Sequence, residues 1–267
     1  MGALDGRVAL ITGGGRGQGR AHALALAAAG ADIVAADAPG AMTDLTYPLG
    51  TEDDLRETAK LVEALGRRCS PLTLDVRDSA AVGAAIKQTV ADMGSLDIVL
   101  ANAGIVSTGR LEEVTDGVWQ QLVDTNLTGV FHTLRAAIPV MRQQRFGRIV
   151  VTSSMGGRMG IPELAAYNAT KWGVIGLAKS VALEVAKEGV TVNVICPTTV
   201  QTPMVQPTGS DDIPNDLVRR MIKANPIPQP WLQPQDVSRG VLYLVTDPGV
   251  ITGSVLEIGL GGSARIH

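Results

Sequence analysis

Short apolar runs alternate with longer helical patterns along the whole chain. The runs predict strands at residues 8–11, 32–36, 68–74, 96–101, 147–153, 190–196 and 254–258. The segments between them predict one helix from a glycine-rich turn to Gly30, and further helices at 52–65, 79–93, 115–144, 164–188 and 235–246. Strands that alternate with helices in this way are expected to lie parallel to one another.

The alternation indicates an α/β fold with a seven-stranded parallel sheet and helices on both of its faces. Ala, Val, Gly and Leu are abundant, and aromatic residues make up only 3% of the chain, which suits helices packed tightly on a sheet. No internal repeat or linker divides the pattern. We therefore expect a single domain over residues 1–267.

Two segments are longer than the loops that connect strands and helices in a simple α/β fold. Residues 38–51 form an insertion after the second predicted strand, and residues 202–234 form a proline-rich segment that contains Met204, Met221 and Trp231. Long loops at the carboxyl ends of parallel strands often cover ligands. We expect 202–234 to be a substrate lid. For 38–51, a ligand cover and an ordinary surface loop remain open at this point.

Charge and composition exclude several kinds of partner. The formal net charge of −3 gives no electrostatic footprint for nucleic acid, and no basic amphipathic stretch indicates membrane binding. The N-terminus enters a strand without the regions of a signal peptide, so we expect a cytoplasmic protein. Cys69 and Cys196 are expected to be reduced, buried thiols rather than a disulfide.

The first turn, residues 12–19, reads Thr-Gly-Gly-Gly-Arg-Gly-Gln-Gly and follows an apolar strand directly. Glycines at such a turn let the backbone approach a pyrophosphate, and the N-terminus of the next helix supplies N–H donors. The spacing differs from Gly-x-Gly-x-x-Gly, so the position of the turn carries the argument. The candidate cofactor-binding residues here are Gly13, Arg16, Gly17, Gln18 and Gly19, with Arg16 able to contact a phosphate or the 38–51 insertion.

Asp37 follows the second predicted strand and is suited to accept hydrogen bonds from the hydroxyls of an adenosine ribose. Its negative charge would repel a 2′-phosphate, and no arginine follows immediately to favour one, so the site favours NAD over NADP. A capping or turn aspartate is the simpler alternative. Asp75, beside Val76, is placed to bond the adenine amino group, and Asn102-Ala103-Gly104 offers a small turn under the adenosine.

Tyr167 and Lys171 stand four residues apart within a predicted helix, and Ser154 precedes the tyrosine by thirteen residues. Residues at i and i+4 share one helix face, so the ammonium can lie beside the phenol and lower its pKa. Ser154 can hold the substrate oxygen that the tyrosine protonates or deprotonates. A Tyr-x-x-x-Lys pair alone is usually an ordinary surface pair; the serine and the glycine turn make it a candidate active site.

Taken together, these motifs resemble the short-chain dehydrogenase/reductase family over nearly the whole chain. The resemblance implies a Rossmann-like doubly wound domain, a homotetramer, and an NAD-dependent oxidoreductase that interconverts an apolar secondary alcohol and its ketone. It makes Tyr167 the acid/base, Ser154 the group that orients the substrate oxygen, and Lys171 a ligand of the nicotinamide ribose. Asn126 would hold a water of a proton relay, and the carboxamide would lie near Pro197, Val200 and Thr202.

A narrower resemblance comes from the 38–51 insertion and from the sequence Cys-Pro-Thr-Thr-Val-Gln-Thr-Pro-Met at 196–204. Both resemble the mycofactocin-coupled, carveol dehydrogenase-like subgroup. That resemblance implies a terpenoid-like alcohol, a retained NAD and a peptide-derived redox carrier as partner. One residue departs from the family: Thr198 stands where many members have glycine, so the backbone path near the nicotinamide is expected to differ.

Two other functions fit parts of the sequence. A 3-oxoacyl thioester reductase would exchange its cofactor freely, but it does not need the 38–51 insertion and Asp37 speaks for NAD. A non-catalytic NAD-sensing protein would not need the set Asn126, Ser154, Tyr167 and Lys171. His22 and His132 have no metal-ligand partners nearby in the sequence, so we expect packing roles for them and no catalytic metal.

Overall fold

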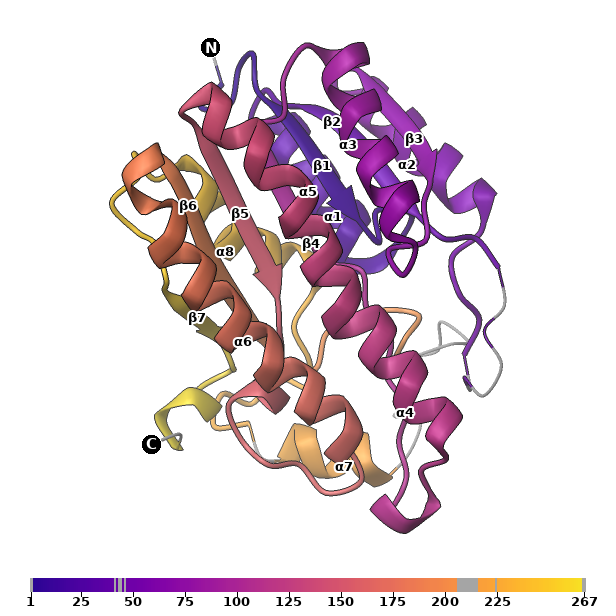
Figure 1. Cartoon of the computed structure of the whole chain (residues 1–267). Coiled ribbons are helices and arrows are strands. Elements are labelled where there is room, and N and C mark those ends of the chain that lie inside the picture. Colours follow the sequence, from indigo (N-terminus) through magenta and orange to yellow (C-terminus); the bar gives the residue numbers. More distant parts are fainter. Residues whose placement is uncertain are drawn as a thin grey trace.

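The computed structural model describes residues 2–40, Met42, Leu45, 47–205, 216–223 and 225–265. Seven parallel strands form one sheet in the order β3-β2-β1-β4-β5-β6-β7 (Figure 1). All seven strands expected from the apolar runs are present. Their bounds are β1 Val8–Thr12, β2 Asp32–Asp37, β3 Cys69–Thr73, β4 Ile98–Ala101, β5 Gly147–Thr152, β6 Val190–Pro197 and β7 Val255–Ile258.

Helices cover both faces of the sheet, as the alternation predicts (Figure 1). One layer contains α1 (Gly17–Ala28), α2 (Glu52–Glu63) and α8 (Pro234–Thr246), whose apolar residues share a core with β1 and β2. The other contains α3 (Ser79–Met93), α5 (Gly129–Gln144) and α6 (Ala165–Val185). Strands buried between two such layers must be apolar on both faces, which explains the continuous rather than alternating runs.

The chain reverses its direction of sheet growth between β1 and β4. From β1 the strand order runs outwards to β2 and β3, and the chain then returns to the other side of β1 to add β4 and its successors. The loops after β1 and β4 therefore leave in opposite directions and open a crevice at the carboxyl ends of the strands. This topological switch point is the expected ligand site of an open α/β sheet.

The helix predicted at 115–144 is present, but it is not α-helical throughout. The structure has α4 (Asp116–Val123), then a π-helical segment at Asp124–Thr128, then α5. A π-turn widens the helix by one residue and often occurs at functional sites. The predicted extent of the helix is therefore confirmed, and the sequence did not reveal the π-helical turn, which carries Asn126.

A second difference concerns the proline-rich segment, which contains a short helix, α7 (Asp216–Lys223), that the sequence analysis did not predict. Residues 206–215 and residue 224 of the expected lid lie outside the described residues. Leu217 and Val218 of α7 are buried, whereas Arg219 and Arg220 are exposed. The helix is therefore amphipathic and packs one face on the molecule.

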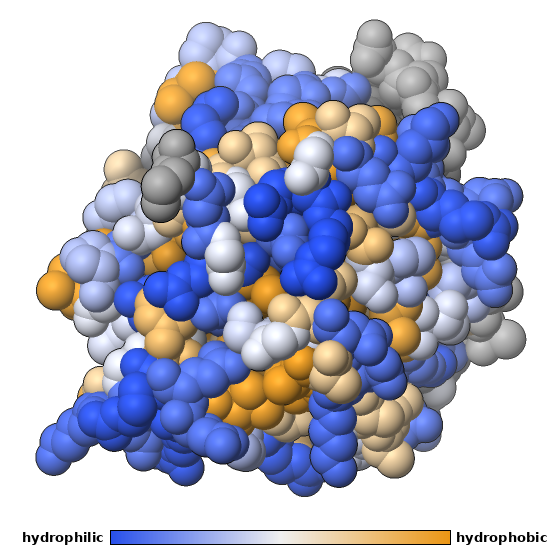
Figure 2. All heavy atoms as spheres, turned by 90° about the horizontal axis from the view of Figure 1, so that it is seen from above, coloured by the Kyte–Doolittle hydropathy of each residue, from blue (hydrophilic) through white to orange (hydrophobic). Residues whose placement is uncertain are grey.

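The face opposite to α7 carries mainly hydrophilic residues, with smaller hydrophobic areas between them (Figure 2). No helix within the described ranges is long and apolar enough to cross a membrane. The amino ends of the strands point towards this face and the carboxyl ends point towards α7 (Figure 1). Ligands of open α/β sheets bind at the carboxyl ends of the strands, so the functional site is expected on the side of α7.

Candidate active site

The glycine turn lies in the crevice between β1 and β4 and needs its glycines for space. A Cβ at Gly19 would lie 1.9 Å from the carbonyl oxygen of Gly13, and a Cβ at Gly13 would lie 2.9 Å from the Cα of Ala103. Gly13 and Gly17 also have positive φ angles of 67° and 54°. The backbone is thus drawn tightly around the start of α1, whose first N–H groups have no side-chain cap.

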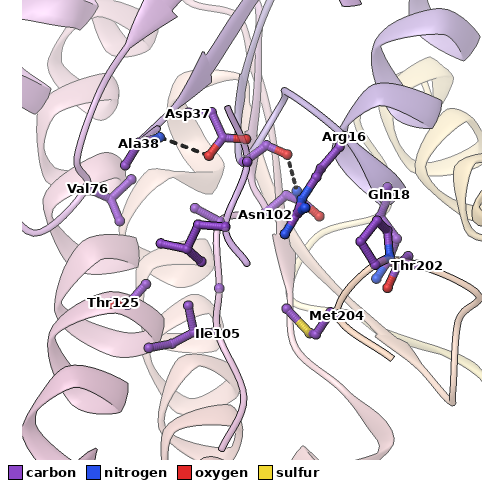
Figure 3. A pocket seen from close by; sticks show the side chains of 18 of the residues that line it. Arg16, Gln18, Asp37, Ala38, Val76, Asn102, Ile105, Thr125, Thr202 and Met204 are labelled. Atoms are coloured by element: carbon purple, nitrogen blue, oxygen red, sulfur yellow. Dashed lines mark hydrogen bonds between the residues drawn. The ribbon is translucent and has the colours of Figure 1, made fainter. Parts of the chain in front are cut away.

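A cleft follows this turn from the end of β2 to the start of the proline-rich segment; we call it the glycine-loop cleft. Arg16, Gln18 and Thr202 lie on one side of it, and Val76, Thr125 and Ile105 lie on the other (Figure 3). The predicted cofactor residues that line this cleft are Gly13, Arg16, Gly17, Gln18, Gly19, Asp37, Asp75, Val76, Asn102, Ala103, Gly104 and Thr202.

Thr12 holds the two sides of the crevice together. Its hydroxyl oxygen accepts from the main-chain N–H of Asn102 at 3.0 Å and from that of Ala103 at 3.1 Å. The side-chain amide of Asn102 donates back to the carbonyl oxygen of Thr12 at 3.0 Å. The small turn that follows β4 is therefore fixed beside the glycine turn, as the sequence motif predicts.

Asp37 ends β2 inside the cleft, where its carboxylate accepts from the N–H groups of Gly15 and Ala38, each at 2.9 Å. Burial raises the pKa of Asp37, and these hydrogen bonds oppose that shift. Each carboxylate oxygen can accept more than one hydrogen bond, so the group can still receive a ribose hydroxyl. A Cβ at Gly15 would lie 2.9 Å from the carboxylate, which accounts for the glycine there.

Asp75 also lines the cleft, but its carboxylate forms a bidentate ion pair with Arg77, with distances of 2.6 to 3.0 Å. The hydrogen bonds from Arg77 lower the pKa of Asp75. The carboxylate is therefore held in one orientation and stays ionised. Its predicted bond to an adenine amino group must use the lone pairs that Arg77 leaves open.

The walls of the glycine-loop cleft fit a bound dinucleotide. Buried side-chain oxygens of Gln18 and Thr125 have no hydrogen-bond partner within the described part of the chain, although both residues line the cleft. Buried polar atoms are normally paired, so unpaired ones that line a cleft indicate a polar ligand. The uncapped N-terminus of α1 suits a pyrophosphate, and Asp37 suits a free ribose.

The Tyr167 side chain lies in a second cavity that adjoins the cleft; we call it the Tyr167 cavity. Helix α6 begins at Ala165, so Tyr167 and Lys171 lie one turn apart on the same face. A hydrogen bond joins Ser154 to the Tyr167 side chain. Lys171 Nζ lies 5.6 Å from the centre of the Tyr167 ring and donates to the carbonyl oxygen of Thr152 at 2.9 Å.

Burial dominates the proton affinities of this pair. It raises the pKa of Tyr167 to about 12, although the hydrogen bond from Ser154 opposes the shift. Burial also lowers the pKa of Lys171 to about 8. Lys171 was expected to lower the tyrosine pKa, and this direction is not found, because the surroundings shield both groups from water and so disfavour the charged form of each.

Asn126 lies in the π-helical segment and joins the site to its surroundings. Its amide oxygen accepts from Ile105 N–H at 2.8 Å, and its amide nitrogen donates to the Ile105 carbonyl at 2.9 Å and to the Thr170 hydroxyl at 3.2 Å. A Cβ at Gly104 would lie between the Asn126 oxygen and Lys171 Nζ, at 3.2 and 3.4 Å. The side chain thus positions β4 against α6, and its part in a proton relay stays a prediction.

Pro197, Val200 and Thr202 line the Tyr167 cavity, and their contact with a carboxamide stays a prediction. Val200 forms an isolated parallel bridge with Leu232, which brings both ends of the proline-rich segment together. Thr198 N–H donates to the Ile258 carbonyl at 3.0 Å. Its φ is not positive, so threonine fits this position without strain.

The 38–51 insertion covers the junction of the two cavities. Tyr47 is buried and lines both, and its hydroxyl accepts from Val106 N–H at 2.8 Å. The guanidinium of Arg16 donates to the Pro48 carbonyl, which confirms the contact with the insertion that the sequence left as an option. Residues 41, 43, 44 and 46 lie outside the described residues.

Tyr47 was missed by the sequence analysis, and so were Ile105 and Thr125 as parts of the cleft. The signal available for Tyr47 was that it is the one aromatic residue in the sequence of the 38–51 insertion. Met204 lines both cavities and Met221 lines the Tyr167 cavity, as expected for lid residues, whereas Trp231 is buried without lining either. Long-range packing, rather than local pattern, decided which of these residues meet.

The part of the chain that the structure describes contains no cluster of His, Cys, Asp and Glu that could hold a metal ion. His22 is buried, with Nδ1 2.8 Å from the Ser238 hydroxyl, and His132 Nδ1 lies 3.1 Å from the Val76 carbonyl. Both histidines therefore have packing roles. Cys69 and Cys196 are free thiols, as expected; Cys196 is buried, but the expectation of burial was wrong for Cys69, which lies on the edge strand β3 and is only partly buried.

Comparison with known proteins identifies relatives over the full chain. The profile of the short chain dehydrogenase family matches residues 7–213. A (-)-trans-carveol dehydrogenase of Rhodococcus erythropolis is 44% identical over 277 aligned positions, which cover 99% of this chain and 100% of the relative.

Two solved structures extend the comparison. Carveol dehydrogenase from Mycobacterium avium, in complex with NAD, has a TM-score of 0.92 at 39% identity and covers 99% of this chain and 100% of its own. A short chain dehydrogenase from Mycobacterium paratuberculosis bound to NAD has a TM-score of 0.90 at 35% identity, covering 98% and 100%. Both confirm the seven-stranded Rossmann-like fold.

Proposed function

Because this chain belongs to the short-chain dehydrogenase family, we propose that it is an NAD-dependent oxidoreductase that interconverts an apolar secondary alcohol and its ketone. The observation that carries the proposal is the hydrogen bond between Ser154 and Tyr167, beside Lys171, in a cavity that adjoins the glycine-loop cleft. NAD, when bound, takes up or supplies the hydride. The residues of the chain bind, orient and move the proton.

Tyr167 is the acid/base of the proposed reaction. With a pKa of about 12 its phenol is protonated at neutral pH and can donate a proton to a substrate oxygen as charge develops there. Ser154 donates a second hydrogen bond to the same oxygen, an arrangement of the oxyanion-hole type. In the oxidation direction the phenolate must form, and the Lys171 ammonium is the adjacent positive charge that stabilises it.

We propose that NAD lies along the glycine-loop cleft with its pyrophosphate at the start of α1. Asp37 would bind the adenosine ribose, Lys171 the nicotinamide ribose, and Thr202 and the backbone of Val200 the carboxamide. Support for NAD comes from Asp37, because a buried carboxylate at this point repels a 2′-phosphate. The relatives described as bound to NAD share the fold over nearly all of this chain.

The walls of the Tyr167 cavity support an apolar substrate. Away from Ser154 and Tyr167, the cavity is lined by Ile161, Leu164, Leu217, Val218 and Met221. Such walls favour a hydrocarbon ring over a charged or strongly polar molecule. We propose a terpenoid-like cyclic alcohol, the class to which the substrate in the name of the Rhodococcus relative belongs.

The proposal also covers the quaternary structure, the retention of the cofactor and the electron acceptor. The exposed apolar residues Trp119, Phe131, Trp172 and Leu183 on α4, α5 and α6 support a homotetramer, which light scattering would test. The contacts of Tyr47 with Val106 and of Arg16 with Pro48 hold the 38–51 insertion in place; we call these two contacts the strap. The strap supports retention of NAD. A retained cofactor would in turn pass its electrons to a peptide-derived, mycofactocin-like carrier. A single domain over residues 1–267 and a cytoplasmic location complete the proposal.

Turnover of trans-carveol tests the function directly. Wild-type protein should oxidise it with NAD or, if the cofactor does not exchange, with a dye such as dichlorophenolindophenol as electron acceptor. Tyr167→Phe keeps the ring and its packing but removes the proton donor, so we expect a loss of about 100-fold or more in turnover with unchanged NAD content. Full activity of Tyr167→Phe would refute the assignment of this tyrosine.

The amount of NAD(H) released on denaturation after extensive dialysis separates the alternatives. A stoichiometric amount supports a retained cofactor, and an empty protein supports free exchange, as in a 3-oxoacyl thioester reductase. Asp37 and the insertion argue against that reductase. A non-catalytic NAD-sensing protein would bind NAD without turnover of any alcohol, which the presence of the whole catalytic set argues against.

A further inference from the structure

Three walls of the Tyr167 cavity come from separate parts of the chain. The first is residues 106–108 after β4, the second is the loop before α6 with Ile161 and Leu164, and the third is the buried face of α7. Glu163 lies in the loop that forms the second wall, and it is bonded to a residue next to the first wall and to a residue of the third. This residue has no role in the reaction described above.

The contacts of Glu163 use both its main chain and its side chain. Its carbonyl oxygen accepts from Gly109 N–H at 2.9 Å, directly after the first wall. Its carboxylate accepts from the guanidinium of Arg220 at 2.6 Å, and Arg220 is a residue of α7. One residue thus links the loop after β4, the loop before α6 and the helix over the cavity.

Glu163 also has an unusual backbone conformation. Its φ is +66°, one of three positive values among the non-glycine residues that the structure describes. A glutamate gains nothing locally from this left-handed conformation, and such strain persists where the surroundings determine it and tends to occur at ligand sites. Here the surroundings are the Gly109 bond on one side and Arg220 on the other.

We propose that Glu163 is a positioning residue for substrate: through Arg220 it sets the distance between α7 and the loop before α6, and so favours bulky ring alcohols over small ones. The ion pair lies at the surface, with side-chain exposures of 39% for Glu163 and 56% for Arg220. An exposed pair of this kind is weak, so its loss should weaken substrate binding modestly without unfolding α7. The proposal rests on the function proposed above.

The chain offers a matched control one residue from Arg220. Arg219 lies on the same helix, is exposed and carries the same charge, but the Glu163 carboxylate is bonded to Arg220. The variants Glu163→Gln and Arg220→Gln each remove one side of the pair without changing side-chain size greatly. Arg219→Gln removes the same charge from α7 and leaves the pair intact.

The first measurement is steady-state kinetics with trans-carveol and with cyclopentanol as a small ring alcohol. Glu163→Gln and Arg220→Gln should each raise KM for trans-carveol about two- to fivefold with little change in kcat, the size expected of a surface pair. KM for cyclopentanol should not change. The charge-swapped double variant Glu163→Arg, Arg220→Glu should restore the wild-type KM, and Arg219→Gln should behave as wild type.

Hydrogen exchange of the α7 amides gives a readout that does not need turnover. Exchange at 216–223 should be faster in Glu163→Gln and in Arg220→Gln, and normal in Arg219→Gln and in the charge swap. Unchanged exchange in both single variants would overturn the proposed role of the Glu163–Arg220 pair, as would an equal fall in kcat for both alcohols. If the wild-type protein turns over neither alcohol, but exchange at 216–223 is still faster in the two single variants, the role of the Glu163–Arg220 pair is supported and the proposed substrate is refuted instead.

Discussion

Replacing Gly19 by alanine adds one methyl group at the tightest point of the glycine loop. Its Cβ would lie 1.9 Å from the Gly13 carbonyl oxygen, 2.7 Å from its carbon and 2.9 Å from the Gly14 Cα. Ordinary contacts of a Cβ begin near 3.4 Å. The start of α1 or the turn itself must therefore move by more than an ångström, because all three neighbours are backbone atoms that no rotamer change can displace.

The displacement should affect NAD binding more than folding. Overpacking costs about 1–3 kcal/mol, and an alanine inside a helix returns up to about 1 kcal/mol relative to glycine, so the folded state should survive. A shift of about 1 Å in a binding site can cost about 100-fold in activity. We therefore expect Gly19→Ala to lose most of its bound NAD(H) and to turn over substrate about 100-fold more slowly. Its free energy of unfolding should fall by no more than about 3 kcal/mol.

Gly83 provides the matched control, because it lies within α3 and a Cβ there would meet no atom within 4 Å. Gly83→Ala should raise the free energy of unfolding by up to about 1 kcal/mol and leave NAD content unchanged. Urea denaturation gives the stabilities, and absorbance of the denatured supernatant gives NAD(H) per subunit. Wild-type NAD content in Gly19→Ala would refute the reasoning, because it would mean that the loop does not need the close approach.

Three other predictions follow from individual side chains. Asp37→Ser should raise the affinity for NADP relative to NAD by removing a buried negative charge that faces the 2′ position, which competition binding would measure; no change in the ratio would exclude Asp37 from the ribose site. Arg16→Met removes the hydrogen bond to the Pro48 carbonyl, so any retained NAD should leave faster, as followed by exchange with labelled NAD; an unchanged rate would show that the strap does not limit release. Burial lowers the pKa of His22 from 6.5 to about 3, so as the pH falls the unfolded chain takes up this proton before the folded chain does. The contribution of neutral His22 to the free energy of unfolding should therefore be complete above about pH 6.5 and be lost, by a few kcal/mol, as the pH drops towards 3. His22→Asn should flatten this dependence in urea melts, and an equally steep loss in that variant would place the acid sensitivity elsewhere.

Local pattern in the sequence determined the sheet and much of the site. Short runs rich in apolar residues predicted seven strands, because strands in the middle of a parallel sheet are buried on both faces and so are apolar without interruption; the edge strand β3 is only partly buried. Helical spacing placed Tyr167 and Lys171 on one face of α6, and the glycine turn predicted the cleft at the start of α1. Each of these inferences depends on residues close in sequence, where covalent geometry fixes the outcome.

Tertiary packing decided the features that join distant segments. Asn126 lies in a π-turn and bonds to Ile105 and Thr170, contacts that no periodicity reveals. The pKa of Tyr167 depends on how completely its surroundings exclude water, and burial there outweighs the charge that its helix neighbour supplies. The place of Tyr47 at the junction of the two cavities likewise depends on contacts between parts of the chain far apart in sequence, because only the folded chain brings the 38–51 insertion against the loop after β4.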